Sequence, residues 1–151
     1  DAAIRPNQIF AVSLTHSPLA SVTVRRAIVA ECRAHLLTPF GLRSLSPQDP
    51  AYRGRYAGGV AERDAAYHQG SVWGWLLGHY ALAEYRVTGR AGLPRQRLEA
   101  IAGHLCQAGL GQVSEIFDGD PPHAPRGAPA QAWSVACTLE AWWRLGREKA
   151  Q

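Results

Sequence analysis

The chain has 151 residues, of which 46% are hydrophobic and 19% charged, so we expect a globular domain with a core rather than a disordered segment. Its net charge of +4 comes from scattered arginines, which argues against a nucleic-acid-binding surface. No apolar run approaches the ~20 residues that a membrane span requires. Because the chain begins at Asp1 and lacks methionine, we expect an excised or trimmed segment, with residues 1–151 belonging to a single domain.

Apolar residues recur at helical spacing in several stretches of the chain. This periodicity predicts helices over residues 6–15, 21–37, 71–87, 94–108 and 130–145. In the second stretch the predicted apolar face consists of Val24, Ile28, Cys32 and Leu36. In the last stretch the apolar residues are Trp133, Ala136, Leu139 and Trp143.

Two long connections rich in proline and glycine separate these helices, at residues 39–59 and 109–129. Loops of this length are uncommon in a compact domain unless they carry function. Within the second loop, residues 113–117 alternate between polar and apolar and predict a short extended segment. The pattern therefore predicts an all-α domain of about five helices whose functional residues lie in the loops.

Cysteine and histidine spacing gives no sign of a metal site. Cys32, Cys106 and Cys137 are far apart and lie in apolar helical surroundings, which predicts buried free thiols in a reducing cytoplasm. The histidines have neither a partner at i, i+4 nor a cysteine at ligand spacing. No glycine-rich phosphate loop follows a strand. We therefore expect no metal and no cofactor.

Glu115 differs from the other carboxylates in the loops because it lies in the short extended segment between Val113 and the pair Ile116 and Phe117. An apolar surround disfavours the charged form of a carboxyl group and suits it to proton transfer. The alternative from local sequence is a solvent-facing glutamate on an edge strand.

Aromatic and polar residues suited to sugar binding accompany this carboxylate. Sugar rings stack on aromatic side chains, and their hydroxyl groups pair with amides, carboxylates and guanidinium groups. Residues 5–8 and 63–70 supply such partners, and the alternative interpretation of each stretch is helix capping and core hydrogen bonding. Trp73 and Trp75 are spaced so that one faces the core and one a cleft. For Trp73 and Trp143 core packing is the favoured interpretation.

Several runs, in order along nearly the whole chain, resemble the amylo-α-1,6-glucosidase family of glycogen debranching enzymes. They are RPNQ (5–8), LTPFGLRSLS (37–46), YRGRY (52–56), RDAAYHQGSVWGWL (63–76), SEIFDGD (114–120), PRG (125–127) and AQAWS (130–134). Two positions depart from the family pattern. Gly74 stands where proline is usual, and Ala128 and Pro129 replace a Cys-Ile-like pair.

The resemblance implies a fold and an activity. The fold would be an (α/α)6 toroid, of which this chain forms the C-terminal part, so the remaining N-terminal part of the same barrel would be a partner. The activity would be cytoplasmic, inverting hydrolysis of α-1,6-linked glucose at the branches of glycogen and branched α-glucan oligosaccharides.

The resemblance also assigns residues. It implies that Glu115 is the general base and that the general acid lies upstream of this chain, with Asp64 as the fallback. The residues that it implies for the glucose pocket are Arg5, Asn7, Arg43, Asp64, Tyr67, His68, Trp73 and Gln131. A non-catalytic carbohydrate-binding or regulatory module on the same scaffold is the alternative. The long loops argue against a third interpretation, a helical-repeat scaffold.

Overall fold

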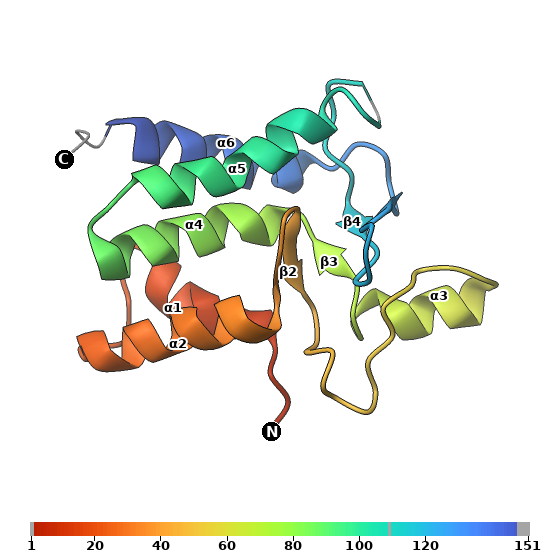
Figure 1. The fold of residues 1–151 in the computed structure, drawn as a ribbon, viewed down its shortest axis with the longest axis horizontal. Coiled ribbons are helices and arrows are strands. Elements are labelled where there is room, and N and C mark those ends of the chain that lie inside the picture. Colours follow the sequence, from red (N-terminus) through yellow and green to blue (C-terminus); the bar gives the residue numbers. More distant parts are fainter. Residues whose placement is uncertain (1, 109, 148–151) are drawn as a thin grey trace.

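The computed structural model describes residues 2–108 and 110–147 and shows packed helices with a small sheet at one end (Figure 1). The helices are η1 (Pro6–Ile9), α1 (Phe10–Ser13), α2 (Val22–His35), α3 (Val60–Tyr67), α4 (Trp75–Thr88), α5 (Gly92–His104) and α6 (Ala132–Arg147). The strands are β1 (Leu37–Thr38), β2 (Gly41–Arg43), β3 (Val72–Trp73), β4 (Ile116–Phe117) and β5 (Pro125–Arg126). None of the described helices is long and apolar enough to cross a membrane.

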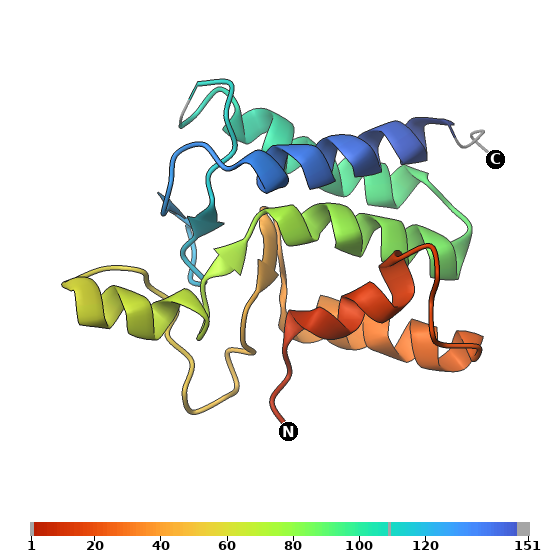
Figure 2. The same ribbon diagram turned by 180° about the vertical axis from the view of Figure 1, so that it is seen from behind.

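Helix α4 is the centre of the helical part, with α1 and α2 on one side and α5 and α6 on the other (Figures 1 and 2). It contributes to two buried apolar clusters. Tyr80 packs in the cluster with α2, and Leu77 packs in the cluster with α5 and α6. Gly78 lets the α6 backbone approach closely, because a Cβ atom there would lie 2.2 Å from the carbonyl oxygen of Cys137. This two-sided burial explains the nearly continuous apolar sequence of α4.

The five strands form one antiparallel sheet in the order β1-β2-β3-β4-β5. Leu42 pairs with Trp73, Val72 pairs with Phe117, and Phe117 pairs with Pro125. The sheet therefore joins the two long loops to each other, next to the start of α4 (Figure 1). The prediction of an all-α domain holds only in coarse terms. Strands of two or three residues are too short to show a period, and their pairing is non-local.

One predicted helix needs correction, and one helix was not expected. The helix expected over residues 71–87 begins at Trp75, because Val72 and Trp73 form the β3 ladder instead. Helix α3 was not predicted at all. Only Ala66 in it is buried, so it has no apolar period, and its start is fixed by Glu62 Oε2, which accepts the Gly59 N–H at 2.5 Å. The described residues do not close into a ring, so the toroid remains a prediction.

Residues on the outer faces of α2 and α6 also differ from expectation. Cys32 and Leu36 are buried as predicted, but Val24 is 44% exposed. On α6 the core prediction for Trp143 is wrong, since its side chain is 57% exposed. Small residues such as Ala141 form the face of α6 that packs on α4, which leaves larger apolar side chains outside. The exposed ones are Trp133, Leu139, Trp142 and Trp143.

The prediction of buried free thiols is partly confirmed. All three cysteines are free, with Cys32 buried and Cys137 half-buried. Cys106 is exposed, and the prediction is wrong there because α5 ends at His104 and the chain leaves the helical layer.

Candidate active site

The backbone around Glu115 is anchored on both sides. Before it, the backbone N–H of the buried Ser114 donates to Nε2 of the buried His104 at 3.2 Å. After it, Ile116 and Phe117 are fully buried in β4, which lies between β3 and β5. Glu115 therefore does not lie on an edge strand, which corrects this part of the alternative drawn from local sequence. Its backbone N–H also donates to the Ala128 carbonyl at 2.9 Å, so the backbone is anchored at the rim of the core.

Three donors reach the carboxylate of the half-buried Glu115. The Tyr67 hydroxyl donates to Oε1 at 2.5 Å, and the Gln131 amide donates to the same oxygen at 3.5 Å. The backbone N–H of Ala128 donates to Oε2 at 3.0 Å. The expected apolar surround is thus provided only to the neighbours Ile116 and Phe117, while the carboxylate itself lies among polar partners.

Tyr67 is the last residue of α3 and belongs to an aromatic group. Its ring contacts Tyr56, His68 and Trp73 at centroid distances of 5.8, 4.9 and 4.8 Å. Burial, and then the hydrogen bond to Glu115, raise the pKa of the Tyr67 phenol well above its ordinary value of 10.0. The phenol therefore keeps its proton across the neutral range and acts as a donor to Glu115.

Glu115 lines an open pocket of about 690 Å³ together with Tyr56, Arg63, Arg126 and the backbone of residues 127–128. It is the one carboxylate among the described residues that line this pocket. The guanidinium of Arg126 donates from two of its nitrogens to both carboxylate oxygens of the buried Asp118, at 3.0–3.2 Å. This pairing raises the pKa of the guanidinium. Asp118 also accepts the backbone N–H of Tyr56 at 2.9 Å, so one carboxylate ties both walls together.

A second, smaller pocket of about 420 Å³ contains other residues that the sequence analysis selected, namely Arg5, Asp64 and His68. Arg5 donates to the backbone oxygens of Ser44 and His68 and to the Gln69 amide at 2.8–3.2 Å. It therefore fixes the loop after α3 as well as lining the pocket. His68 is exposed and stacks on Trp73 at 5.3 Å with an interplanar angle of 3°.

The remaining selected residues have different positions. Trp73 is 9% exposed within the core, and its indole N–H donates to the Tyr67 carbonyl at 3.3 Å. Arg43 is half-buried on β2 and donates to the Gly119 carbonyl at 2.9 Å. Asn7 is exposed on η1 and lines neither of the two pockets. The structure thus brings Tyr67 and Gln131 to Glu115 and places Arg5, Asp64 and His68 in the neighbouring pocket.

Three pocket residues were missed by the sequence analysis: Tyr56, Arg63 and Arg126. Each belongs to a run that carries the family resemblance, but no helical or strand period marked them. The signal for Arg63 is its position four residues before Tyr67, which places both on one face of α3. It could be used only once α3 was known to be a helix. Among the described residues, no group of three or more histidine, cysteine or acidic side chains could hold a metal ion.

The site belongs to a mostly helical domain in which a hydrogen-bonded carboxylate lines an open pocket between two long loops. Residues 1–140 match the sequence model of the family described as amylo-alpha-1,6-glucosidase. The chain belongs to this family of glycoside hydrolases.

A relative among curated proteins supports the same assignment. The glycogen debranching enzyme of Saccharomyces cerevisiae is 30% identical over 170 aligned residues, which cover 96% of this chain and 11% of the yeast protein. The chain thus spans about a tenth of the length of this relative.

Proposed function

We propose that this chain provides the general-base part of a cytoplasmic, inverting α-1,6-glucosidase that acts on the branches of glycogen and branched α-glucan oligosaccharides. The observation that carries the proposal is Glu115, a carboxylate that lines an open pocket and accepts hydrogen bonds from Tyr67, Gln131 and the Ala128 N–H. Family membership supplies the class of reaction.

In this proposal the hydrogen bonds to Glu115 favour one of its two oxygens as the proton acceptor. A carboxylate has about four lone-pair sites, about two on each oxygen. On Glu115, Oε1 accepts from Tyr67 at 2.5 Å and from Gln131 at 3.5 Å, whereas Oε2 accepts from the Ala128 N–H alone among the described residues, at 3.0 Å. Oε2 therefore keeps a site for a water molecule. As that water attacks the anomeric carbon, its proton passes to Oε2, and a carboxylic acid on the other side protonates the departing glycosidic oxygen.

The two pockets would bind different parts of the substrate. The Glu115 pocket, with Arg63 and Tyr56, would hold the glucose whose bond is cleaved. The neighbouring pocket, with Arg5, Asp64 and His68, would contact further sugar hydroxyls. The ring of Trp73 packs against the rings of Tyr67 and His68 and supports both. Arg43 and Asn7 would contribute through the loops that carry them.

The general acid and the other wall of the site come from the remaining part of the same barrel. The support is twofold. No second carboxylate of the described residues lines the Glu115 pocket, although inversion requires a pair about 6.5–9.5 Å apart. Moreover, α6 presents Trp133, Leu139 and Trp143 at 54%, 63% and 57% exposure, an apolar face of the kind that packs against further helices. Both features fit the C-terminal part of an (α/α)6 toroid.

The experiment is proton NMR of the glucose first released from an oligosaccharide with a single α-1,6-linked glucosyl branch, using the protein that carries this chain. An inverting enzyme releases β-glucose, and mutarotation to the mixture follows. Release of α-glucose first contradicts the assignment of Glu115 as a base for water. Binding of the oligosaccharide without any release contradicts the enzyme proposal and favours the non-catalytic carbohydrate-binding module.

A further inference from the structure

A hollow of about 1080 Å³ lies around the connection between α4 and α5. Its walls come from α2, α4, the start of α5 and the end of α6. Figure 1 shows this connection at the opposite end of α4 from β3 and β4. Since α4 has 14 residues, it separates this hollow from the Glu115 site by about 20 Å.

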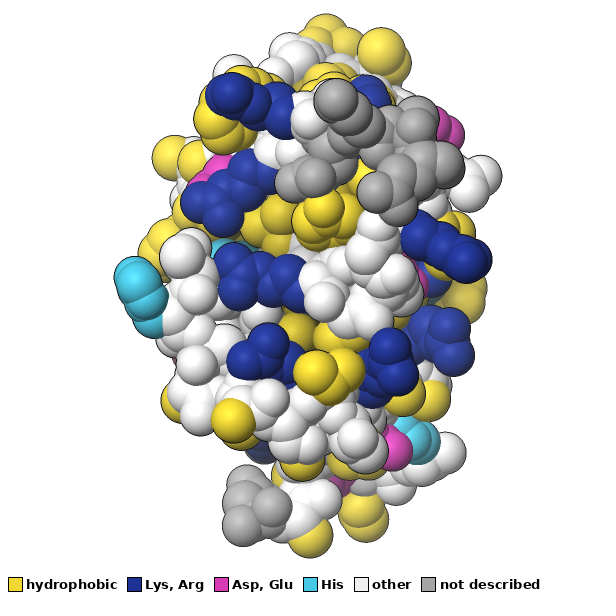
Figure 3. All heavy atoms as spheres, turned by 90° about the vertical axis from the view of Figure 1, so that its left-hand side faces the viewer, with side chains coloured by type: hydrophobic (Ala, Val, Ile, Leu, Met, Phe, Trp, Pro, Cys, Tyr) yellow, Lys and Arg dark blue, Asp and Glu magenta, His cyan; other side chains and the backbone are white. Residues whose placement is uncertain are grey.

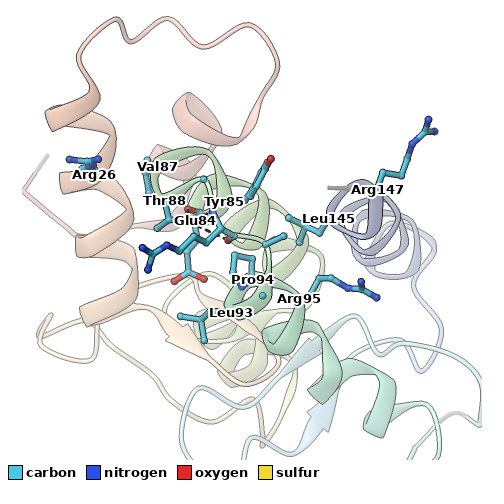
Figure 4. Close-up of a pocket in the computed structure, with 14 residues that line it drawn as sticks. Arg26, Glu84, Tyr85, Val87, Thr88, Leu93, Pro94, Arg95, Leu145 and Arg147 are labelled. Carbon is cyan, nitrogen blue, oxygen red and sulfur yellow. Dashed lines mark hydrogen bonds between the residues drawn. The ribbon is translucent and has the colours of Figure 1, made fainter. Parts of the chain in front are cut away.

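Basic side chains surround this hollow. Figure 3 shows them gathered on this end of the molecule, with apolar side chains exposed between them. Four arginines line the hollow, and each comes from a different segment: Arg26, Arg90, Arg95 and Arg147. In the close-up, Arg26 extends from α2 on one side, whereas Arg95 and Arg147 lie on the other side (Figure 4).

This positive charge is not neutralised within the described part of the chain. Arg26 and Arg90 form none of the ion pairs found between described residues. The one carboxylate among the described lining residues is Glu84, which is buried and already receives two hydrogen bonds from Arg97 at 2.7 and 3.0 Å. Glu84 therefore offers no compensating charge, and the hollow favours an anion.

The hollow also has fixed and apolar elements. Arg95 lies over the ring of Trp142 at 4.8 Å, and this contact restrains its guanidinium before any ligand arrives. The buried Pro94 and Leu145 provide an apolar floor. A guanidinium group binds phosphate oxygens through paired hydrogen bonds. One guanidinium group is enough to pair with a carboxylate, so several of them around one hollow favour the larger charge of a phosphate. A concave hollow suits a small molecule better than the continuous track that a nucleic acid requires.

We propose that this hollow is a binding site for the phosphate group of a small phosphorylated molecule, distinct from the Glu115 site. Arg26 from α2 and Arg90 from the connection between α4 and α5 bind the phosphate, and Arg95 adds positive charge on the wall opposite Arg26 (Figure 4). The organic part of the ligand packs on Pro94 and Leu145.

The test is isothermal titration calorimetry with glucose 6-phosphate, using the protein that carries this chain at constant ionic strength. We expect one molecule to bind at this site, inorganic phosphate to compete with it, and glucose not to compete. The double variant Arg26→Gln/Arg90→Gln should weaken binding about tenfold or more, because two charged donors are lost. The variant Arg33→Gln/Arg55→Gln removes the same charge from exposed positions outside the hollow and should weaken binding less than about twofold.

Three results would overturn the proposal. The first is no binding of glucose 6-phosphate by a protein that melts normally. The second is equal weakening by the two double variants, which would show attraction to net charge alone. The third is that inorganic phosphate does not compete. None of these results bears on Glu115, because glucose release from a branched oligosaccharide is measured separately.

Discussion

The Tyr67 hydroxyl donates a 2.5 Å hydrogen bond to Oε1 of Glu115, across 48 positions of sequence. The bond connects α3, which follows the first long loop, to the segment just before β4. The bond also gives a role to α3, a helix in which only Ala66 is buried. Helix α3 places Tyr67 where the phenol can orient a carboxylate that the second loop provides.

Replacing Tyr67 with phenylalanine removes this donor and keeps the ring contacts with Trp73 and His68. A hydrogen bond to a charged group contributes about 1.5–3 kcal/mol, so we expect kcat to fall roughly 10- to 100-fold. Because Tyr67 acts through Glu115, KM should change little. Steady-state kinetics of glucose release checks both values. A rise in KM with kcat unchanged would show that Tyr67 binds the sugar instead.

Replacing Gly127 with alanine should displace the Glu115 carboxylate. Gly127 has φ 66°, and a Cβ atom there would lie 2.4 Å from Oε2. The left-handed backbone costs an alanine about 1–2 kcal/mol, and a carboxylate displaced by about 1 Å can lose about 100-fold in rate. Gly89→Ala is the matched control, because Gly89 has φ 70° but nothing within 4 Å of such a Cβ atom. Equal loss of activity in the two variants would contradict this explanation.

The exposed face of α6 predicts that the isolated 151-residue chain self-associates. We expect analytical ultracentrifugation to show species larger than the monomer. The double variant Leu139→Gln/Trp143→Gln should shift the distribution towards the monomer. Leu93→Gln/Leu110→Gln, which changes exposed apolar residues outside α6, should not. A wild-type chain that is a monodisperse, cooperatively melting monomer would argue against the partial barrel.

Burial of His104 predicts a pH dependence of stability. Burial lowers the pKa of His104 below its ordinary value of 6.5, and its Nε2 accepts the Ser114 N–H. Between the folded pKa and 6.5 the unfolded chain binds more protons than the folded chain. The free energy of unfolding therefore falls as the pH drops below 6.5, by at most about 1.4 kcal/mol per pH unit.

Urea unfolding at several pH values between 5 and 7.5, compared with His104→Gln, checks this prediction. The variant should show a flatter dependence, with some slope left because burial also lowers the pKa of His79. His16→Gln, at an exposed position, should behave like the wild type. A wild-type stability that does not change below pH 6.5 would contradict the assignment.

The sequence predicted the helices that carry a buried apolar face and could not predict elements that depend on distant partners. Cys32 and Leu36 mark α2 because their burial follows a helical period. By contrast, Trp73 lies in β3 because Leu42 and Ile116 flank it, and neither is near it in sequence. Trp143 looked like a core residue because of its type, but the small residues of α6 take the inner face.

The candidate site was predictable in its centre and less so around it. Glu115, Tyr67 and Gln131 were selected from the sequence, and the structure brings them together. Arg63 was not selected because it lines the pocket only when α3 is a helix. The hydrogen bond from the Ala128 N–H to Glu115 could not be predicted either, because any residue type except proline can supply a backbone donor.

The central claim is tested most directly by Glu115→Gln in the protein that carries this chain, with Glu99→Gln, at an exposed position of α5, as the control. Glucose release from an oligosaccharide with one α-1,6-linked glucosyl branch is measured, and the melting temperature verifies folding. We predict that Glu115→Gln folds normally and loses nearly all turnover, whereas Glu99→Gln keeps it. A folded Glu115→Gln variant that releases glucose at the wild-type rate would contradict the assignment of Glu115 as the general base.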